Sequence, residues 1–198
     1  MLAATVQRTC RRSAKLLRIL RARCALIWLR LHHGTDTFPA DLQLAAGVQV
    51  SISDGGRARI ARRCSIDRHA TVVVKHGTLT IGEGSHVGVG AYICARESVT
   101  IGRDVLIGEY VTIRDQNHAF GPGRRTSDAG FLTAPVTIGD NVWLGAKVTV
   151  TRGVSIGANS VIGANSVVTS NIPADVVAAG VPARVLRSTD ARDAAAAT

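Results

Sequence analysis

The sequence predicts an all-β solenoid, a chain wound into stacked coils of short strands. The first observation is a six-residue beat of apolar residues in the C-terminal half: Ile138, Leu144, Val150, Ile156, Ile162 and Val168. The second is a small or β-branched residue four positions after each of the first five: Val142, Val148, Val154, Ser160 and Ser166. The third is composition, because 20 of the 198 residues are glycine and only 4% are aromatic. A period of six matches neither an α-helix nor the simple alternation of a lone strand.

Each hexad is expected to form one flat side of a coil, with two side chains pointing inward and a turn at the corner. Three hexads would close one coil, and coils stacked about 4.8 Å apart would pair their backbones. Ile, Val and Ala side chains can fill such a narrow prism without large aromatic groups. The alternative architecture is a β-sandwich in which the spacing is fortuitous.

The same beat runs earlier in the chain, with interruptions: Ile60, Ile66 and Val72, then Ile81, Val87 and Ile93, then Ile101, Ile107 and Ile113. Slips of two or three residues near 73–80 and 94–100 predict small corner loops. A gap of 25 residues separates Ile113 from Ile138, so a loop of about twenty residues is expected to leave the solenoid and return to it. Long loops on rigid scaffolds are often functional. By this count about six or seven coils occupy 60–172.

The N-terminal segment carries most of the net charge of +10. Residues 1–33 contain no acidic side chain and eight basic ones: Arg8, Arg11, Arg12, Lys15, Arg18, Arg21, Arg23 and Arg30. Helical spacing of these cations beside leucines and isoleucines predicts a basic amphipathic helix. The uncharged run Cys24–Leu29 is six residues long, too short to span a bilayer.

Two interpretations of this helix stay open. It could lie on an anionic membrane surface with Trp28 at the interface, or it could cap the open first coil of the solenoid. No motif supports nucleic-acid binding. The sequence contains four cysteines, Cys10, Cys24, Cys64 and Cys94, and no two of them form a CxxC pair. We therefore expect reduced thiols in a cytoplasmic protein. If the helix binds lipid, the protein would lie peripherally on the inner face of the cytoplasmic membrane.

Three stretches carry a resemblance to a known family: RDQNHAF (114–120), APVTIGDNVWLGAKVTV (134–150) and IGANSVIGANSVVTSNIPADVVAAGVPARVLR (156–187). They resemble the hexapeptide-repeat acyltransferases, in particular the maltose/galactoside O-acetyltransferase-like and saccharide O-acetyltransferase branches. The resemblance implies a left-handed parallel β-helix and a homotrimer with active sites between neighbouring solenoids. It also implies transfer of acetyl from acetyl-CoA to a hydroxyl of a saccharide or glycolipid precursor.

With this resemblance the chain divides into four parts and one insertion. Residues 1–33 form the basic helix and 34–59 a lead-in segment. The β-helix acyltransferase domain follows over 60–187, with an extruded loop at 114–137. Residues 188–198 form a short C-terminal tail.

His118 is the expected general base. Acyl transfer to an alcohol needs a group that takes the hydroxyl proton, and imidazole is matched to neutral pH. Either Asp115 or Glu97 would hold the imidazole in the required tautomer, and the two candidates rank equally. Register arithmetic places Ile113 over Ile93, which would set Asn117 and His118 above Glu97 and Ser98.

The resemblance also implies contacts with acetyl-CoA at Trp143, Ala146, Ala164, Thr169, Arg184 and Arg187. Small residues would let the pantetheine lie close to the backbone, and basic residues would meet the phosphates. A backbone N–H of Gly145–Ala146 would stabilise the oxyanion. Ser170 stands where many relatives have Lys, which leaves Arg184 and Arg187 as the favoured phosphate contacts. Trp143 could instead pack between subunits.

Three other functions compete with this one. An N-acyltransferase acting on an amino sugar, amino acid or antibiotic shares the same signature, and a non-catalytic scaffold would explain the solenoid but not the loop histidine. A metal enzyme of the γ-carbonic-anhydrase type needs a second histidine five residues after the first, where this chain has Gly123. No metal is therefore expected.

Overall fold

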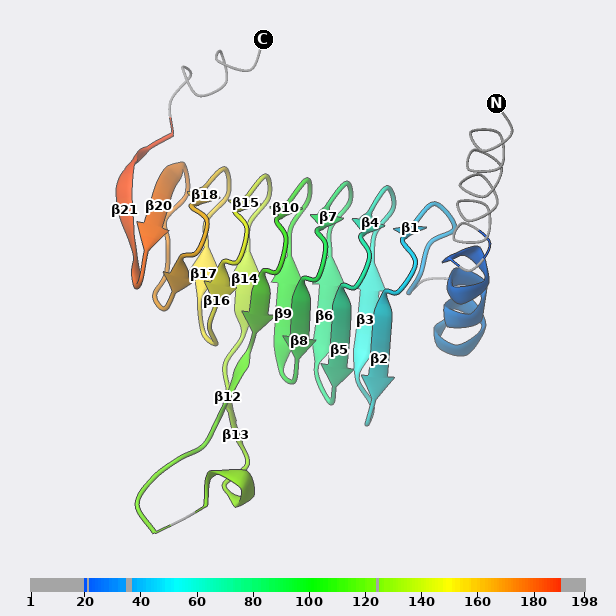
Figure 1. The fold of residues 1–198 in the computed structure, drawn as a ribbon, viewed down its shortest axis with the longest axis horizontal. Helices are drawn as coiled ribbons and strands as arrows, with labels where there is room; N and C mark the ends of the chain where they lie inside the picture. Colours follow the sequence, from blue (N-terminus) through cyan, green and yellow to red (C-terminus); the bar gives the residue numbers. More distant parts are fainter. Residues whose placement is uncertain (1–19, 21, 35–36, 124, 190–198) are drawn as a thin grey trace, which may run out of the picture.

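The computed structural model describes residues 20, 22–34, 37–123 and 125–189. These residues form a parallel β-solenoid of about six turns with a helix at its N-terminal end (Figure 1). The predicted fold class is confirmed. Most of the basic segment 1–33 and nearly all of the tail 188–198 lie outside the described residues.

Three sheets form the sides of the prism, and their strands are parallel except that β21 runs antiparallel to β20 at the C-terminal end. Face A contains β1 (Gln43–Leu44), β4 (Ser65–Ile66), β7 (His86–Val87), β10 (Leu106–Ile107), β15 (Trp143–Leu144), β18 (Val161–Ile162), β20 (Val176–Gly180) and β21 (Ala183–Ser188). Face B contains β2 (Gln49–Ser53), β5 (Thr71–Lys75), β8 (Tyr92–Ala95), β11 (Thr112–Arg114), β16 (Thr149–Val150) and β19 (Val167–Val168). Face C contains β3 (Arg57–Ile60), β6 (Thr78–Ile81), β9 (Ser98–Ile101), β14 (Val136–Ile138) and β17 (Ser155–Ile156).

The six-residue beat is the inner lining of this prism. Every member of the C-terminal series from Ile138 to Val168 is buried, and so are the residues four positions later. The two serines among them have hydrogen-bond partners: the Ser160 hydroxyl donates to the Pro173 carbonyl at 2.8 Å, and the Ser166 hydroxyl accepts from Gly180 N–H at 3.0 Å. Burial of these serines therefore leaves no hydroxyl unsatisfied.

Close stacking of the coils explains the glycines at one corner. A Cβ added to Gly82 would lie 2.4 Å from the backbone of Gly102, and one added to Gly102 would lie 2.7 Å from the backbone of Gly139. No larger side chain fits without moving the neighbouring coil.

The slips near 73–80 and 94–100 were expected to be corner loops, and this prediction is wrong. The additional residues lengthen the sides of the coils into strands β5, β6, β8 and β9. Val74, Leu79, Ala95 and Val99 point inward from these strands and are buried. Because all four are apolar and two of them, Val74 and Val99, are β-branched, they extend the core more favourably than they would form loops.

The solenoid also begins before residue 60. Residues 43–59, which the sequence placed in the lead-in segment 34–59, already form β1, β2 and, with Ile60, β3, and these strands pair with the second coil. Residues 22–33 are helical and close the open end of this first coil, with Leu29 buried against the core. No helix in the described part of the chain combines the length and apolar character needed to cross a membrane.

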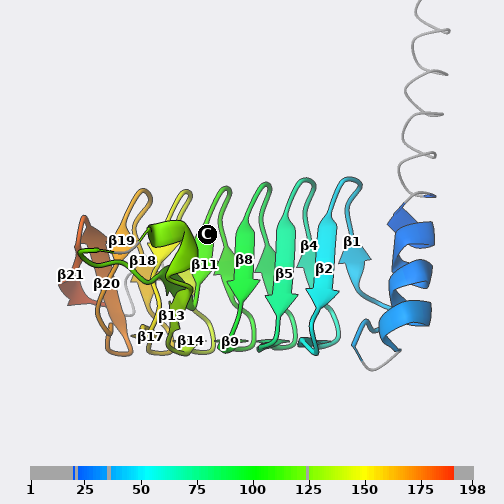
Figure 2. The ribbon, with the colours of Figure 1, turned by 90° about the horizontal axis from the view of Figure 1, so that it is seen from below.

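The long loop is an arm that projects from the corner between faces B and C (Figures 1 and 2). Its root is an antiparallel hairpin of β12 (Gln116–His118) and β13 (Phe131–Thr133), and its tip contains a short 3₁₀ turn, η1 (Thr126–Asp128). The Ala134 N–H donates to the Asp115 carbonyl at 2.9 Å, which ties the two ends of the arm together.

Asp115 anchors the point where the chain leaves the coil. Its side chain is fully buried, and its carboxylate accepts the backbone N–H of Arg96 at 2.9 Å and of Glu97 at 2.7 Å. Hydrogen bonds from N–H groups to a carboxylate are among the stronger ones in proteins.

We expect Asp115→Asn to lower the free energy of unfolding by about 1–3 kcal/mol, because the amide loses the charge and one of its acceptors while two backbone N–H groups stay buried. Asp128→Asn is the matched control, since Asp128 is exposed on the arm and its carboxylate accepts only the neighbouring Ser127 hydroxyl in the described structure. Urea unfolding followed by circular dichroism measures both. Equal stability of the two variants would contradict the anchoring role.

Candidate functional site

His118 lies on β12 at the root of the arm, directly opposite Phe131 on β13. The imidazole is exposed, and its centroid is 4.4 Å from that of the Phe131 ring. The guanidinium of Arg96 lies 3.6 Å from the centroid of the same ring. Phe131 thus joins the arm to the corner of the coil below through a cation–π contact, and its ring packs beside the imidazole.

The two candidate carboxylates share this corner, but neither hydrogen-bonds His118 in the described residues. Both oxygens of Asp115 accept backbone N–H groups, so this side chain stabilises the corner of the coil. Glu97 is exposed, next to Arg96.

The predicted stacking of Asn117 and His118 above Glu97 and Ser98 is wrong. The chain leaves the coil at Gln116, and Val136 of β14 takes the place above Val99 of β9. Register arithmetic assumes that the backbone stays in the coil, and here it departs three residues after Ile113.

The root of the arm packs on face B through Tyr92, Cys94, Arg114 and Gln116. The Gln116 amide donates to the Cys94 sulfur at 3.1 Å, and the Arg114 guanidinium lies 4.8 Å above the Tyr92 ring. Burial raises the pKa of Tyr92, with a further contribution from Cys94, so this phenol stays protonated at neutral pH.

Most of the expected acetyl-CoA contacts form one stripe along the opposite edge of face B, where faces A and B meet. Ala146 and Ala164 occupy this corner in successive coils, and a Cβ on Gly145 would lie 2.7 Å from the Ala164 nitrogen. Trp143 pairs with Val161, which pairs with Val177, which pairs with Arg187. Arg184 pairs with Ala179 on the same terminal hairpin. We call Trp143, Ala146, Ala164, Arg184 and Arg187 the AB stripe.

Of the two backbone N–H groups expected to stabilise the oxyanion, those of Gly145 and Ala146, only the second is left without a backbone acceptor in the described structure. The Gly145 N–H donates to the Ile162 carbonyl at 2.8 Å and belongs to the stacking of the coils. The N–H of Ala146, at the turn that follows β15, donates to no backbone acceptor within the described part of the chain.

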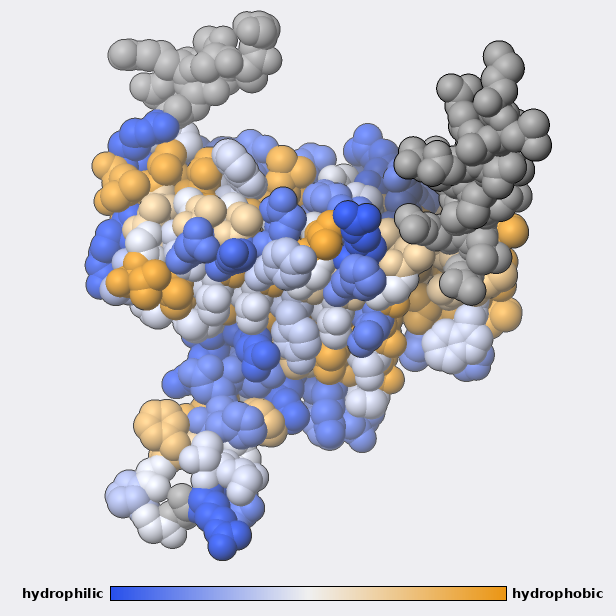
Figure 3. Space-filling view, in the orientation of Figure 1, coloured by the Kyte–Doolittle hydropathy of each residue, from blue (hydrophilic) through white to orange (hydrophobic). Residues whose placement is uncertain are grey.

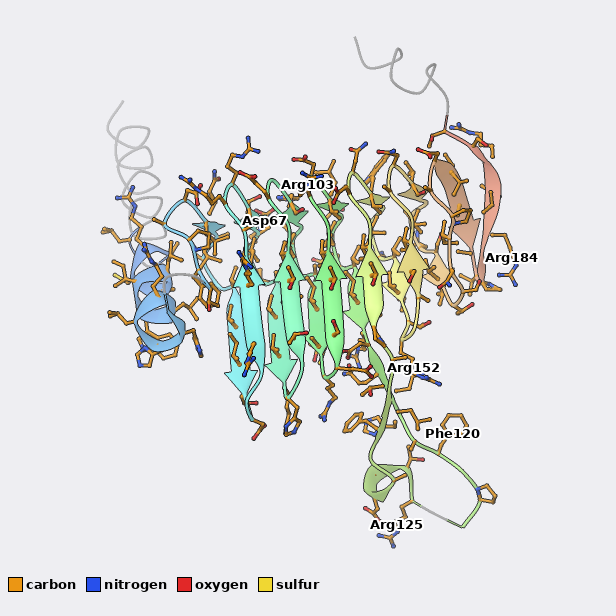
Figure 4. All side chains as sticks on the ribbon, turned by 180° about the vertical axis from the view of Figure 1, so that it is seen from behind. Asp67, Arg103, Phe120, Arg125, Arg152 and Arg184 are labelled. Atoms are coloured by element: carbon orange, nitrogen blue, oxygen red, sulfur yellow. The ribbon has the colours of Figure 1, made fainter. Side chains whose placement is uncertain are left out.

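His118 and the AB stripe lie at different corners of the prism. His118 and Thr169 are at the corner between faces B and C, whereas Ala146 and Ala164 are at the corner between faces A and B. Figure 4 shows Phe120 and Arg125 on the arm, Arg152 where the arm leaves, and Arg184 on the terminal strands. A single chain therefore presents two separate walls, not one complete site.

Sequence reasoning missed Arg96 and Phe131. Phe131 reaches His118 only because β12 and β13 pair in one register, and nothing in the loop sequence specifies that pairing. Arg96 lies outside the recognisable stretches. The contact depends on a coil corner and a returning strand that are 35 residues apart.

The described histidines and cysteines do not assemble a metal centre. No group of three His, Cys, Asp or Glu side chains among the described residues could hold a metal ion. His69 and His76 occupy coil corners with φ of 62° and 63°, a backbone role. Cys24, Cys64 and Cys94 are free thiols, burial raises the pKa of Cys64, and Cys10 lies outside the described residues.

Comparison with known proteins follows the same division of the chain. A family model described as the hexapeptide repeat of succinyl-transferase matches residues 78–113 and 135–170, on either side of the arm. Galactoside O-acetyltransferase of Escherichia coli K12 is 44% identical over 118 residues, which are 57% of this chain and 58% of that protein. This chain thus spans little more than half the length of that relative.

Two further relatives cover comparable or larger parts. WbbJ of Escherichia coli K12, provisionally named a lipopolysaccharide biosynthesis O-acetyl transferase, is 36% identical over 160 residues, with 64% of this chain and 80% of that protein covered. A hexapeptide-repeat acetyltransferase of Vibrio cholerae, solved in complex with acetyl coenzyme A, is 36% identical, with a TM-score of 0.54 over 57% of this chain and 61% of that chain. The repeats, the solenoid and this similarity over most of WbbJ agree: the chain belongs to the hexapeptide-repeat acyltransferase family.

Proposed function

We propose that the protein transfers acetyl from acetyl-CoA to a hydroxyl of a saccharide or glycolipid precursor, with His118 as the general base. The observation that carries the proposal is the placement of His118: an exposed imidazole, held against Phe131 at the root of a projecting arm. Two similar proteins are named as O-acetyltransferases, one for galactosides and one for lipopolysaccharide biosynthesis. Their names support a saccharide acceptor.

In this mechanism the neutral imidazole accepts the hydroxyl proton while the hydroxyl oxygen attacks the thioester carbonyl. The N–H of Ala146 donates to the carbonyl oxygen as that oxygen becomes negative. The imidazolium then returns its proton to the departing thiolate. The products are an acetyl ester and the CoA thiol, so the base is regenerated in each cycle.

Complete sites require a second copy of the chain, and we propose a homotrimer. His118 of one chain would face the AB stripe of the next, because the two walls lie on opposite edges of face B. Phe120 and Leu132 on the arm, with Leu106 and Trp143 on face A, are large exposed apolar residues in the isolated chain. Exposed apolar groups of this kind mark surfaces that bind other molecules.

We expect acetyl-CoA and mixed sugar acceptors to yield alkali-labile acetyl groups, which are esters. An alcohol needs a base more than a free amine does, because a neutral alcohol that keeps its hydroxyl proton is a poor nucleophile. Mass spectrometry before and after mild alkali measures the outcome. Alkali-stable acetyl on an amino sugar would instead favour the N-acyltransferase alternative, and absence of turnover on either class would favour a non-catalytic scaffold.

We expect His118→Ala to reduce kcat by about 10²–10⁴, or roughly 3–5.5 kcal/mol of transition-state stabilisation, with little change in KM for acetyl-CoA. The base acts in the chemical step and does not hold the CoA. His32→Ala is the control, because His32 is exposed on the N-terminal helix, away from the arm. A His118→Ala variant that keeps wild-type turnover would remove His118 from the mechanism.

We expect light scattering to give a mass of about 62 kDa, three times the chain mass of 20.8 kDa. A sharper test mixes two inactive variants: His118→Ala, which lacks the base, and Ala146→Trp, which blocks the AB stripe. Mixed trimers would regain activity, because some interfaces combine an intact His118 with an intact stripe. Lack of complementation, or a fully active monomer, would contradict the shared site.

A further inference from the structure

The N-terminal helix has two sides that serve different purposes. Its inner side covers the first coil: Leu29 is only 5% exposed, and Leu26 packs against the same core. The helix lies across the end of the solenoid in both ribbon views (Figures 1 and 2). This side accounts for the expected capping role.

The outer side is apolar, which capping does not require. Leu20, Ile27 and Leu31 are 50%, 57% and 78% exposed, and Trp28 beside them is 53% exposed. Positions 20, 27 and 31 fall on one line of an α-helix, because seven and eleven residues are close to two and three turns. A terminal cap of a solenoid normally turns a polar face to water. Figure 3 shows hydrophobic surface at this end of the molecule.

Basic side chains flank this apolar stripe. Arg23 lies four residues before Ile27 and Arg30 three residues after it, so both fall on the same flank. Neither takes part in an ion pair within the described structure. The first 33 residues contain eight basic side chains and no acidic one, so the partner of this surface is anionic.

We propose that this helix binds the surface of an anionic lipid bilayer. Leu20, Ile27 and Leu31 enter the boundary between headgroups and acyl chains, Trp28 sits at headgroup level, and the arginines meet lipid phosphates. A second copy of the helix is a poorer occupant, because two segments with eight cations and no anions repel each other.

The geometry gives this binding a defined orientation. A helix lying flat on the bilayer holds the solenoid with its long axis pointing away from the membrane, because the helix crosses the end of the prism. The arm leaves after β11, in the fourth coil from the N-terminal end. At about 4.8 Å per coil, the arm lies roughly 14 Å beyond the first coil, which the helix covers. This height is within reach of the polar portion of a glycolipid. The proposal that this helix binds lipid does not depend on the proposed enzymatic function.

The test is flotation of the intact protein with vesicles of phosphatidylcholine alone or mixed with phosphatidylglycerol. We expect binding to the mixed vesicles that weakens as salt rises, and little binding to the neutral ones. Ile27→Ser with Leu31→Ser should weaken this binding about tenfold or more. Val181→Ser with Leu186→Ser is the matched control, because these exposed apolar residues lie on the opposite end of the solenoid. It should bind like the wild type.

A second variant separates lipid binding from folding. Arg23→Gln with Arg30→Gln leaves the apolar stripe intact and should weaken binding to the mixed vesicles while the far-ultraviolet spectrum is unchanged. Equal vesicle binding by the wild type and both helix variants would overturn the proposal. Equal binding to neutral and anionic vesicles would also overturn it. A helix variant whose only effect is a lower mass in lipid-free light scattering would overturn it too, because that result would identify the surface as a contact between copies of the chain.

Discussion

Backbone pairing between coils is the interaction on which this structure depends. In each coil, N–H groups donate to carbonyls of the next coil, as from Gly102 to Ile138 and from Gly145 to Ile162, both at 2.8 Å. The pairing tolerates little sideways movement, because the corners where Gly82 and Gly102 stack have no room for a Cβ. Inward side chains must then be of limited size, and Ile, Val and Leu supply most of them, with smaller residues such as Ser160 and Ser166 at some positions.

A prism of this kind offers flat outer faces and few concave places. Chemistry that needs an enclosed site must come from a segment that leaves the coil or from another chain. The arm supplies the first, and Asp115 makes its departure possible by satisfying the two backbone N–H groups that the missing next strand would have paired. Because His118 and the AB stripe lie at different corners, the proposed mechanism also requires another chain.

The sequence predicted the fold well because the period of six is repeated many times and each repetition adds evidence. Ile138 to Val168 could be assigned inward without any structure. The slip near 73–80 could not be assigned correctly, since three extra residues can form either a loop or a longer side, and only the packing of Val74 and Leu79 decides. The neighbouring residues in the chain were enough to single out His118 as the candidate base. Its contacts with Phe131 and Arg96 depend on tertiary register, which the local sequence does not encode.

Stacked coils also act as a ruler. Each coil adds a fixed rise of about 4.8 Å, so the height of the arm above the N-terminal helix comes in whole steps. Inserting or deleting one whole coil between Ile66 and Ile107 would move His118 up or down by one step without changing its surroundings. A solenoid can thus be adapted to acceptors of different reach by a change in its number of coils. An enzyme with a single compact core would need a change in the packing of that core.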